Sequence, residues 1–340
     1  MRDLVDKIIK INISEIKNYN FPENELFGLE ILENNVKYEF LIKLRPNNNK
    51  LICFGAKGGL DREKRDLPDF PRFSWHNSFQ ESLIYYADPT FYISKEIKTG
   101  WYMGTEDNWY LERIAEIILK IVENFEVENK NILFYGTSVG GFSSIMLATL
   151  FKKSTALVGN PQILISNHYD SPYNNIKKYC FNDQCEEKIL EKYSYRFNVF
   201  DLFKRESYVP HIIYLVNAKS KRDLYKQCVP FIRELGKLSS FNDNDVEVII
   251  YHDKDGHVGR VTRTVAIPLI KLVLDRKIYY YEENITTSNN DIVSEKLKER
   301  DILINKQKDI INDYKSRKIV KFADKLNNLI KKIFKHNNNF

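Results

Sequence analysis

The chain runs Asn131-Ile-Leu-Phe-Tyr-Gly-Thr-Ser-Val-Gly-Gly-Phe142 near its middle. An apolar run typical of a buried strand leads into Gly-Thr-Ser-Val-Gly-Gly at 136–141, and a helix-like stretch follows from Phe142 to Phe151. Glycines on both sides of the serine allow a turn too tight for a Cβ, and this strained turn lifts the Ser138 hydroxyl out of the sheet. We therefore predict that Ser138 is a nucleophile; an ordinary glycine-rich turn is the alternative interpretation.

A serine hydroxyl is a poor nucleophile unless a histidine takes its proton and a carboxylate orients that histidine. In α/β-hydrolases the acid and then the histidine follow the serine along the chain. Among the six histidines, His257 lies in a turn-rich loop after the strand-like residues 246–251. We predict that His257 is the base, with His252 at the strand end as the alternative.

The acid is expected after the preceding strand. Residues 211–217 form a continuous apolar, β-branched run typical of a buried parallel strand. Asp223 is the first carboxylate beyond this run, and the loop between them can bring it to the carboxyl edge of the sheet, where such sheets bind ligands. We predict that Asp223 orients the histidine; Asp201, Asp253 and Asp255 are the alternatives.

An acyl enzyme also needs two backbone N–H groups that stabilise the developing oxyanion. The first comes from the residue after the nucleophile, which is Val139. The second is expected from the glycine-rich loop at 54–59, which follows a predicted strand at 50–53. Ala56 and Lys57 are the two candidate donors in this loop.

These elements predict an α/β-hydrolase fold with a mostly parallel central sheet, a cap insertion and a C-terminal helical tail. The hydrolase domain is expected at 1–280, with a tyrosine- and asparagine-rich cap at about 163–208, and the tail at 281–340. Other predicted elements are a helix at 4–16, an antiparallel pair at 26–32 and 36–44, an irregular segment at 60–80, a helix at 106–125 and a strand at 155–158.

The chain resembles hydrolase-fold proteins of bacterial surface-polysaccharide synthesis of the XcbB/CpsF type, and more distantly those of the accessory secretion system. The resemblance covers roughly residues 25–275 and departs just after Asp223, where Leu224-Tyr225 stands in place of a frequent histidine. It rests on Ala87-Asp88-Pro89-Thr90, Gly100-Trp101-Tyr102-Met103-Gly104, the turn at 136–141, Gly159-Asn160-Pro161-Gln162, and Asn217 with Asp223.

Relatives of this type include sugar O-acetyltransferases that use the serine as an acyl carrier. The resemblance thus implies O-acetyl transfer from acetyl-CoA to a capsular polysaccharide or glycan precursor, with no bound cofactor. We expect Trp75 and Trp101 to offer flat faces to sugar rings, although buried tryptophans are also common, and Asn160 and Gln162 to contact the substrate. Two alternatives are a carbohydrate esterase and a non-catalytic glycan-binding assembly factor for a glycosyltransferase.

Composition limits the location and the chemistry of the protein. The chain has 43% hydrophobic residues, enough for one large core, but neither a run of eighteen apolar residues nor an apolar signal sequence at its start. We therefore expect a cytoplasmic protein. The four cysteines lack metal-site spacing, so we predict free thiols, no metal and no disulfide.

The C-terminal tail carries a distinct pattern. Residues 293–314 show apolar positions close to a seven-residue repeat, and residues 315–335 form a basic amphipathic pattern. The basic excess in the second part exceeds the net charge of +6 of the whole chain, so the rest is near neutral and no nucleic-acid module is predicted. We expect residues 315–335 to contact the inner membrane surface or a glycosyltransferase; packing on the chain's own domain or on a second copy is the alternative.

Overall fold

The computed structural model describes residues 1, 3–61, 65–241, 245–257 and 261–276. The predicted tail at 281–340 and the domain boundary near residue 280 lie outside these residues, so both stay predictions.

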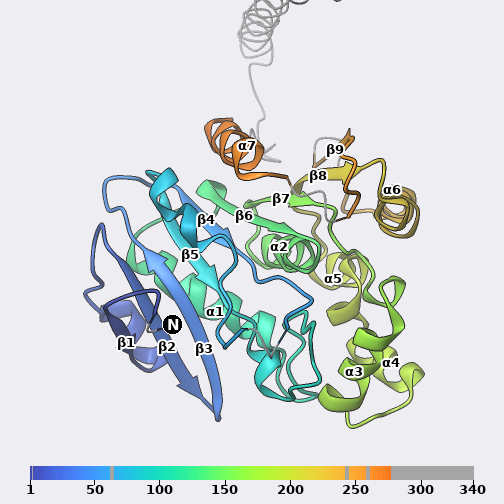
Figure 1. Ribbon diagram of the computed structural model, residues 1–340, viewed down its shortest axis with the longest axis horizontal. Helices are drawn as coiled ribbons and strands as arrows, with labels where there is room; N and C mark the ends of the chain where they lie inside the picture. The colour runs from blue at the N-terminus through green and yellow to red at the C-terminus, as the bar shows by residue number, and fades with distance from the viewer. Residues whose placement is uncertain (2, 62–64, 242–244, 258–260, 277–340) are drawn as a thin grey trace, which may run out of the picture. The chain divides into compact units, whose positions relative to one another are not determined.

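A nine-stranded sheet forms the centre of the described chain, in the order β1-β2-β3-β5-β4-β6-β7-β8-β9 (Figure 1). From β5 to β9 in this order, successive strands run parallel to one another, whereas β3 is antiparallel to both β2 and β5. The predicted mostly parallel sheet is confirmed. The strands are β1 Ile8–Lys10, β2 Leu26–Glu33, β3 Val36–Lys43, β4 Leu51–Phe54, β5 Ser82–Tyr86, β6 Ile132–Thr137, β7 Thr155–Gly159, β8 His211–Asn217 and β9 Val246–Tyr251.

Helices cover both faces of the sheet (Figure 1). Successive residues of a strand point to opposite faces, so on β6 Leu133 and Tyr135 pack in one apolar cluster and Phe134 in the other. α7 lies on the first face through Ile270, and α1, α2 and α5 lie on the second. The α-helices of the described residues are α1 Tyr110–Asn124, α2 Val139–Leu150, α3 Asp170–Cys180, α4 Glu186–Phe197, α5 Val199–Glu206, α6 Val229–Leu235 and α7 Arg263–Asp275.

The segment at 163–208, predicted as a cap, is helical and lies between β7 and β8. It contains α3, α4 and α5, and α5 packs against α2, the helix that follows Ser138. Its role as a cap over the site stays a prediction.

The predicted helix at 4–16 is wrong. Ile8–Lys10 forms β1, which pairs in parallel with β2, and a 3-10 helix at Ile13–Asn18 follows. A helix of about a dozen residues is marginal in water without tertiary packing. The β-branched pair Ile8 and Ile9 instead gains backbone hydrogen bonds at the edge of the sheet.

Other predicted elements are confirmed with shifted boundaries. The antiparallel pair is β2 and β3, joined by Asn34 and Asn35 with φ of 48° and 62°. The helix predicted from residue 106 begins at Tyr110, after a turn in which Thr105 and Asn108 form an isolated bridge. The irregular segment at 60–80 includes a 3-10 helix at Phe73–Ser78.

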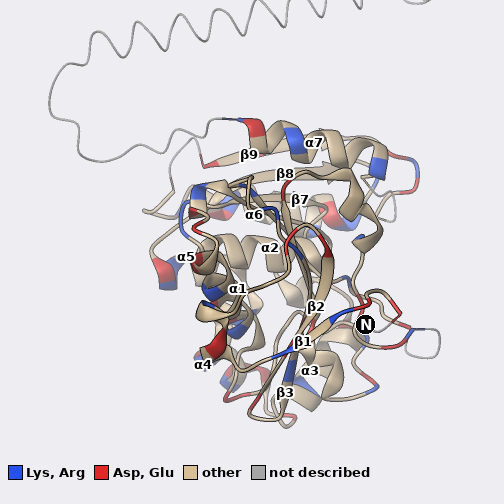
Figure 2. Ribbon diagram, turned by 90° about the vertical axis from the view of Figure 1, so that its left-hand side faces the viewer, with Lys and Arg blue, Asp and Glu red and all other residues tan. Residues whose placement is uncertain are grey.

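Acidic and basic residues are interspersed along the described elements (Figure 2). None of the helices within the described residues is both long enough and apolar enough to cross a lipid bilayer.

Candidate active site

Ser138 occupies a strained turn between β6 and α2. Its φ of 55° and ψ of −118° are unusual for a residue with a side chain. A Cβ on Gly136 would lie 2.0 Å from the carbonyl oxygen of Gly140, so only glycine fits there. The predicted strand, sharp turn and helix are confirmed, and the helix begins at Val139, three residues earlier than expected.

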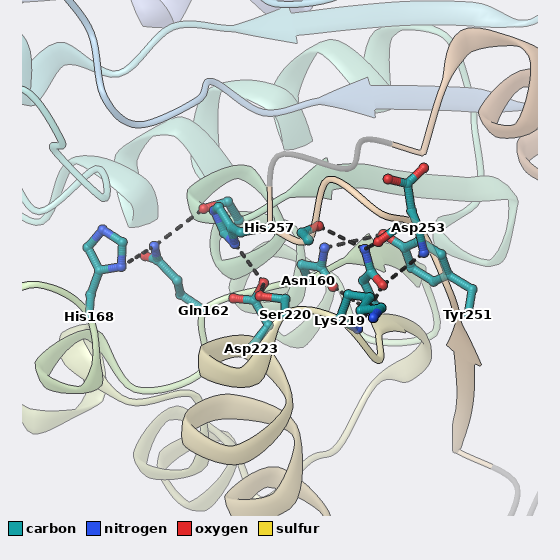
Figure 3. Close-up of polar contacts among 12 residues, drawn as sticks. Asn160, Gln162, His168, Lys219, Ser220, Asp223, Tyr251, Asp253 and His257 are labelled. Atoms are coloured by element: carbon teal, nitrogen blue, oxygen red, sulfur yellow. Dashed lines mark hydrogen bonds and ion pairs between the residues drawn. The ribbon is translucent and has the colours of Figure 1, made fainter.

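His257 and Asp223 form a hydrogen-bonded pair near this turn. His257 Nδ1–H donates to Asp223 Oδ2 at 2.7 Å (Figure 3). The Asp223 side chain is only 3% exposed, whereas the His257 side chain is 43% exposed. The hydrogen bond to Asp223 raises the pKa of His257 above its ordinary value, against the opposing effect of burial. Because Nδ1 carries the bonded proton, Nε2 of the neutral ring is left as a proton acceptor.

Ser138 and His257 line the same small cavity. It has a volume of about 30 Å³ and is also lined by Thr137, Gly159, Asn160, Tyr251 and Val261. This space holds about one or two water molecules. The structure therefore brings together the predicted nucleophile and the predicted base, which lie far apart in sequence.

The alternative residues take other positions. His252 is exposed at the end of β9. Asp201 lies on α5 and accepts hydrogen bonds from Asn198 and Lys204. Asp253 caps a turn by accepting from the backbone N–H of Asp255. His257 is bonded to Asp223 instead of these carboxylates.

Asn217 positions the loop that carries His257, a role that sequence reasoning missed. It is fully buried at the end of β8. Its Oδ1 accepts from the backbone N–H groups of Lys219 and Asp253, and its Nδ2 donates to the carbonyls of Asp253 and Gly256. Two sequence signals point to Asn217: it is a polar amide that closes a mostly apolar strand, and it is one of the residues on which the resemblance rests.

Ser220 also contacts Asp223, the residue that orients His257. Its Oγ–H donates to Asp223 Oδ2 at 2.5 Å, in the turn that leads into the π-helix Asp223–Cys228. The carboxylate thus receives two hydrogen bonds on one oxygen, one from Ser220 and one from His257. These bonds restrict its orientation toward the imidazole.

The oxyanion hole was predicted from the N–H of Val139 and from an N–H of the loop at 54–59. Val139 is the first residue of α2, where backbone N–H groups have no intrahelical acceptor. The prediction that Ala56 is an oxyanion donor is corrected, because the Ala56 N–H already donates to Tyr102 Oη at 2.5 Å in the interior of the protein. Lys57 stays the predicted second donor.

The predicted substrate contacts are mostly part of the protein interior. Trp101 is fully buried and its indole N–H donates to Gln162 Oε1, so its ring offers no open face to a sugar, which corrects that prediction. Trp75 is partly exposed, but it packs edge-on against Phe54 and lies beneath the guanidinium of Arg72.

Asn160 and Gln162 both lie close to Ser138. Asn160 lines the small cavity, where its Oδ1 accepts from the Asn217 N–H and its Nδ2 donates to Tyr251 Oη. Gln162 Nε2 donates to Ser138 Oγ at 3.3 Å. Their contact with a substrate stays a prediction.

Metal-ligating residues do not gather in the part of the chain that the structure describes: no group of three or more His, Cys, Asp and Glu side chains is placed to hold an ion. Cys53, Cys180 and Cys228 are buried free thiols, and Cys185 is exposed.

Comparisons with known proteins identify the fold. No family model and no curated protein sequence matches the chain. The capsule O-acetyltransferase of Neisseria meningitidis serogroup A, in a mutant form bound to CoA, is similar over 76% of this chain and 100% of its own, with 14% identity and a TM-score of 0.55. A glycosylation-associated protein complex from Streptococcus agalactiae is similar over 74% of this chain and 47% of its own, with 12% identity and a TM-score of 0.53.

A third similar structure is FphF, a fluorophosphonate-binding serine hydrolase of Staphylococcus aureus. It matches 75% of this chain and 100% of its own, with 13% identity and a TM-score of 0.51. Similarities at such low sequence identity show the fold alone, so the finer resemblance to capsule proteins of the XcbB/CpsF type stays a prediction. Together with the parallel sheet and the strained turn at Ser138, these similarities establish that the chain has the α/β-hydrolase fold.

Proposed function

We propose that this chain is a serine acyl enzyme that transfers an acetyl group from acetyl-CoA to a hydroxyl of a bacterial surface polysaccharide or its precursor. The observation that carries the proposal is the pair His257–Asp223, joined at 2.7 Å beside the strained Ser138. A buried carboxylate, an imidazole with a free Nε2 and a serine on a tight turn are the parts that acyl transfer requires.

The reaction proceeds in two displacements. In the first, His257 Nε2 accepts the Ser138 proton while Oγ attacks the thioester carbonyl, and the C–S bond then breaks as His257 returns the proton to the departing thiolate. In the second, His257 takes the proton of a sugar hydroxyl, whose oxygen attacks the acyl-enzyme, and the proton passes to Ser138 Oγ as that bond breaks. Val139 and Lys57 N–H groups would stabilise the oxyanion in both steps.

The small cavity supports a small acyl group. About 30 Å³ of space beside Ser138 and His257 is enough for a group of acetyl size. A similar fold is found in a protein described as a capsule O-acetyltransferase bound to CoA, which supports the proposed donor and the proposed class of acceptor. We also propose that residues 315–335 bring the enzyme to the membrane surface or to a glycosyltransferase.

A carbohydrate esterase is the second candidate. The His257 side chain is 43% exposed, so water can reach the base. The similar fluorophosphonate-binding serine hydrolase supports this alternative at the level of the fold. Hydrolysis and transfer use the same residues and differ in which hydroxyl reaches the acyl-enzyme.

Intact-mass spectrometry tests the proposal. We expect wild type to gain a single acetyl group from acetyl-CoA, and a single adduct from a fluorophosphonate probe, while Ser138→Ala gains neither. Acetylation by the thioester supports the transferase, and labelling by the probe alone supports the esterase. No adduct with either reagent on folded protein would contradict an acyl enzyme and favour a non-catalytic assembly factor.

A further inference from the structure

The Gln162 side chain lies against the nucleophile. Its backbone N–H donates to the Ser138 carbonyl at 3.2 Å, which brings the side chain next to the turn. The amide is buried, and its Nε2 lies 3.3 Å from Ser138 Oγ. The same nitrogen lies 3.0 Å from His168 Nδ1 (Figure 3). One amide nitrogen thus serves both Ser138 and His168.

Trp101 determines which way the amide faces. An indole nitrogen can only donate, so the atom that Trp101 Nε1–H meets must be Oε1 of Gln162. The nitrogen of the amide is then the atom that faces Ser138. Trp101 itself is fixed, because it is fully buried and the backbone N–H of its neighbour Tyr102 donates to the buried Asp88 carboxylate.

His168 completes the arrangement as an acceptor. Because an amide nitrogen only donates, His168 Nδ1 must be unprotonated, which places the proton of the neutral ring on Nε2. Burial lowers the pKa of His168 to about 4; the charges of His257 and Arg222 act in the same direction, and the Asp223 carboxylate opposes them. The ring therefore stays neutral over the whole range in which His257 can act as a base.

We propose that Gln162 is a catalytic hydrogen-bond donor to Ser138 Oγ, and that Trp101 and His168 are positioning residues that hold its amide. This proposal rests on the proposed function, since it takes Ser138 as the nucleophile. With one lone pair of Oγ occupied by the Gln162 N–H, the serine proton turns toward His257. When the acyl-enzyme is attacked, the C–Oγ bond breaks and its electron pair returns to Oγ. Gln162 stabilises that charge until His257 delivers the proton taken from the attacking hydroxyl.

Two substitutions isolate the role of the amide. Gln162→Glu keeps the length of the side chain and an acceptor for Trp101, but its carboxylate has no N–H for Oγ. Trp101→Phe keeps an aromatic ring but removes the N–H that orients the amide, together with part of the buried indole ring. We expect the rate constant of fluorophosphonate labelling to fall about tenfold in both Gln162→Glu and Trp101→Phe, because one hydrogen bond is lost and the serine proton is no longer directed toward His257.

Trp109→Phe is the matched control. Trp109 is also buried, but its ring contacts Tyr195 and Arg205 instead of Gln162. We expect this variant to be labelled at the wild-type rate, and thermal unfolding to show that all variants are folded. Should Trp101→Phe fail to fold, Gln162→Glu alone decides.

Nitrogen-15 NMR of labelled histidine gives a readout that a purely structural role would not move. In wild type we expect His168 as a neutral ring protonated on Nε2, with this preference lost in a Gln162→Ala variant. Wild-type labelling rates in both Gln162→Glu and Trp101→Phe, or a His168 ring protonated on Nδ1, would overturn the role of Gln162 and leave the proposed function intact. A wild-type protein that takes no label on Ser138 would overturn the proposed function together with it.

Discussion

Asp223→Asn is expected to slow acylation of Ser138 by about 10⁴-fold, the loss known for the corresponding change in a serine protease. Asp223 accepts the Nδ1 proton of His257 at 2.7 Å and so leaves Nε2 free to take the serine proton. The amide of asparagine can donate to Nδ1 instead, which places the ring proton on Nε2 and removes the base. Because Asp223 is almost fully buried, water cannot replace the lost carboxylate.

The same variant should change the pH dependence. Asp223 raises the pKa of His257, and the neutral ring is the active form, so wild-type labelling should fall as the pH drops through a midpoint above about 6.5. Without the carboxylate the charged form loses its main stabilisation, and the midpoint should move to lower pH. The measurement is the rate constant of fluorophosphonate labelling between about pH 5 and pH 9.

Asp255→Asn serves as the control for this experiment. Asp255 is exposed in the His257 loop and was an alternative acid by sequence, so its loss changes the nearby charge without touching the His257–Asp223 bond. We expect a rate close to that of wild type. Equal losses in Asp223→Asn and Asp255→Asn would contradict the role of Asp223.

Local patterns made much of this arrangement predictable from the sequence. The glycines around Ser138 predict a tight turn, because a larger residue would clash there. The apolar runs of β6 and β8 predict strands that are buried on both faces of the sheet. His257 and Asp223 could be chosen because polar residues that follow parallel strands gather at one edge of the sheet.

Hydrogen bonds between segments that are distant in sequence could not be predicted from such local patterns. Ala56 looked like an oxyanion donor because its loop is glycine-rich, yet Tyr102, 46 residues away, accepts its N–H. Trp101 looked like a sugar platform, yet it contacts Gln162 from across 61 residues. Tertiary hydrogen bonds of this kind leave no periodic signal, and they also decide the environment of Ser138.

Gly136→Ala is expected to lower the free energy of unfolding by more than about 4 kcal/mol, or to prevent folding. The added Cβ would lie 2.0 Å from the Gly140 oxygen and 2.2 Å from the Gly140 carbonyl carbon. Both atoms belong to the backbone of α2, so no side-chain rotation relieves the clash. Relief requires β6 and α2 to separate, which disrupts the turn that holds Ser138. Urea denaturation followed by circular dichroism, or the soluble yield where unfolding is complete, measures the effect.

Gly236→Ala provides the matched comparison, because the chemical change is the same and the surroundings are not. Gly236 follows α6 with φ of −64°, and an added Cβ there meets no atom within 4 Å. Alanine adopts this backbone conformation without strain and reduces the freedom of the unfolded chain, so stability should rise by up to about 1 kcal/mol. Gly136→Ala as stable as Gly236→Ala would mean that β6 and α2 are not held together at the turn, and the strained conformation of Ser138 would lose its structural basis.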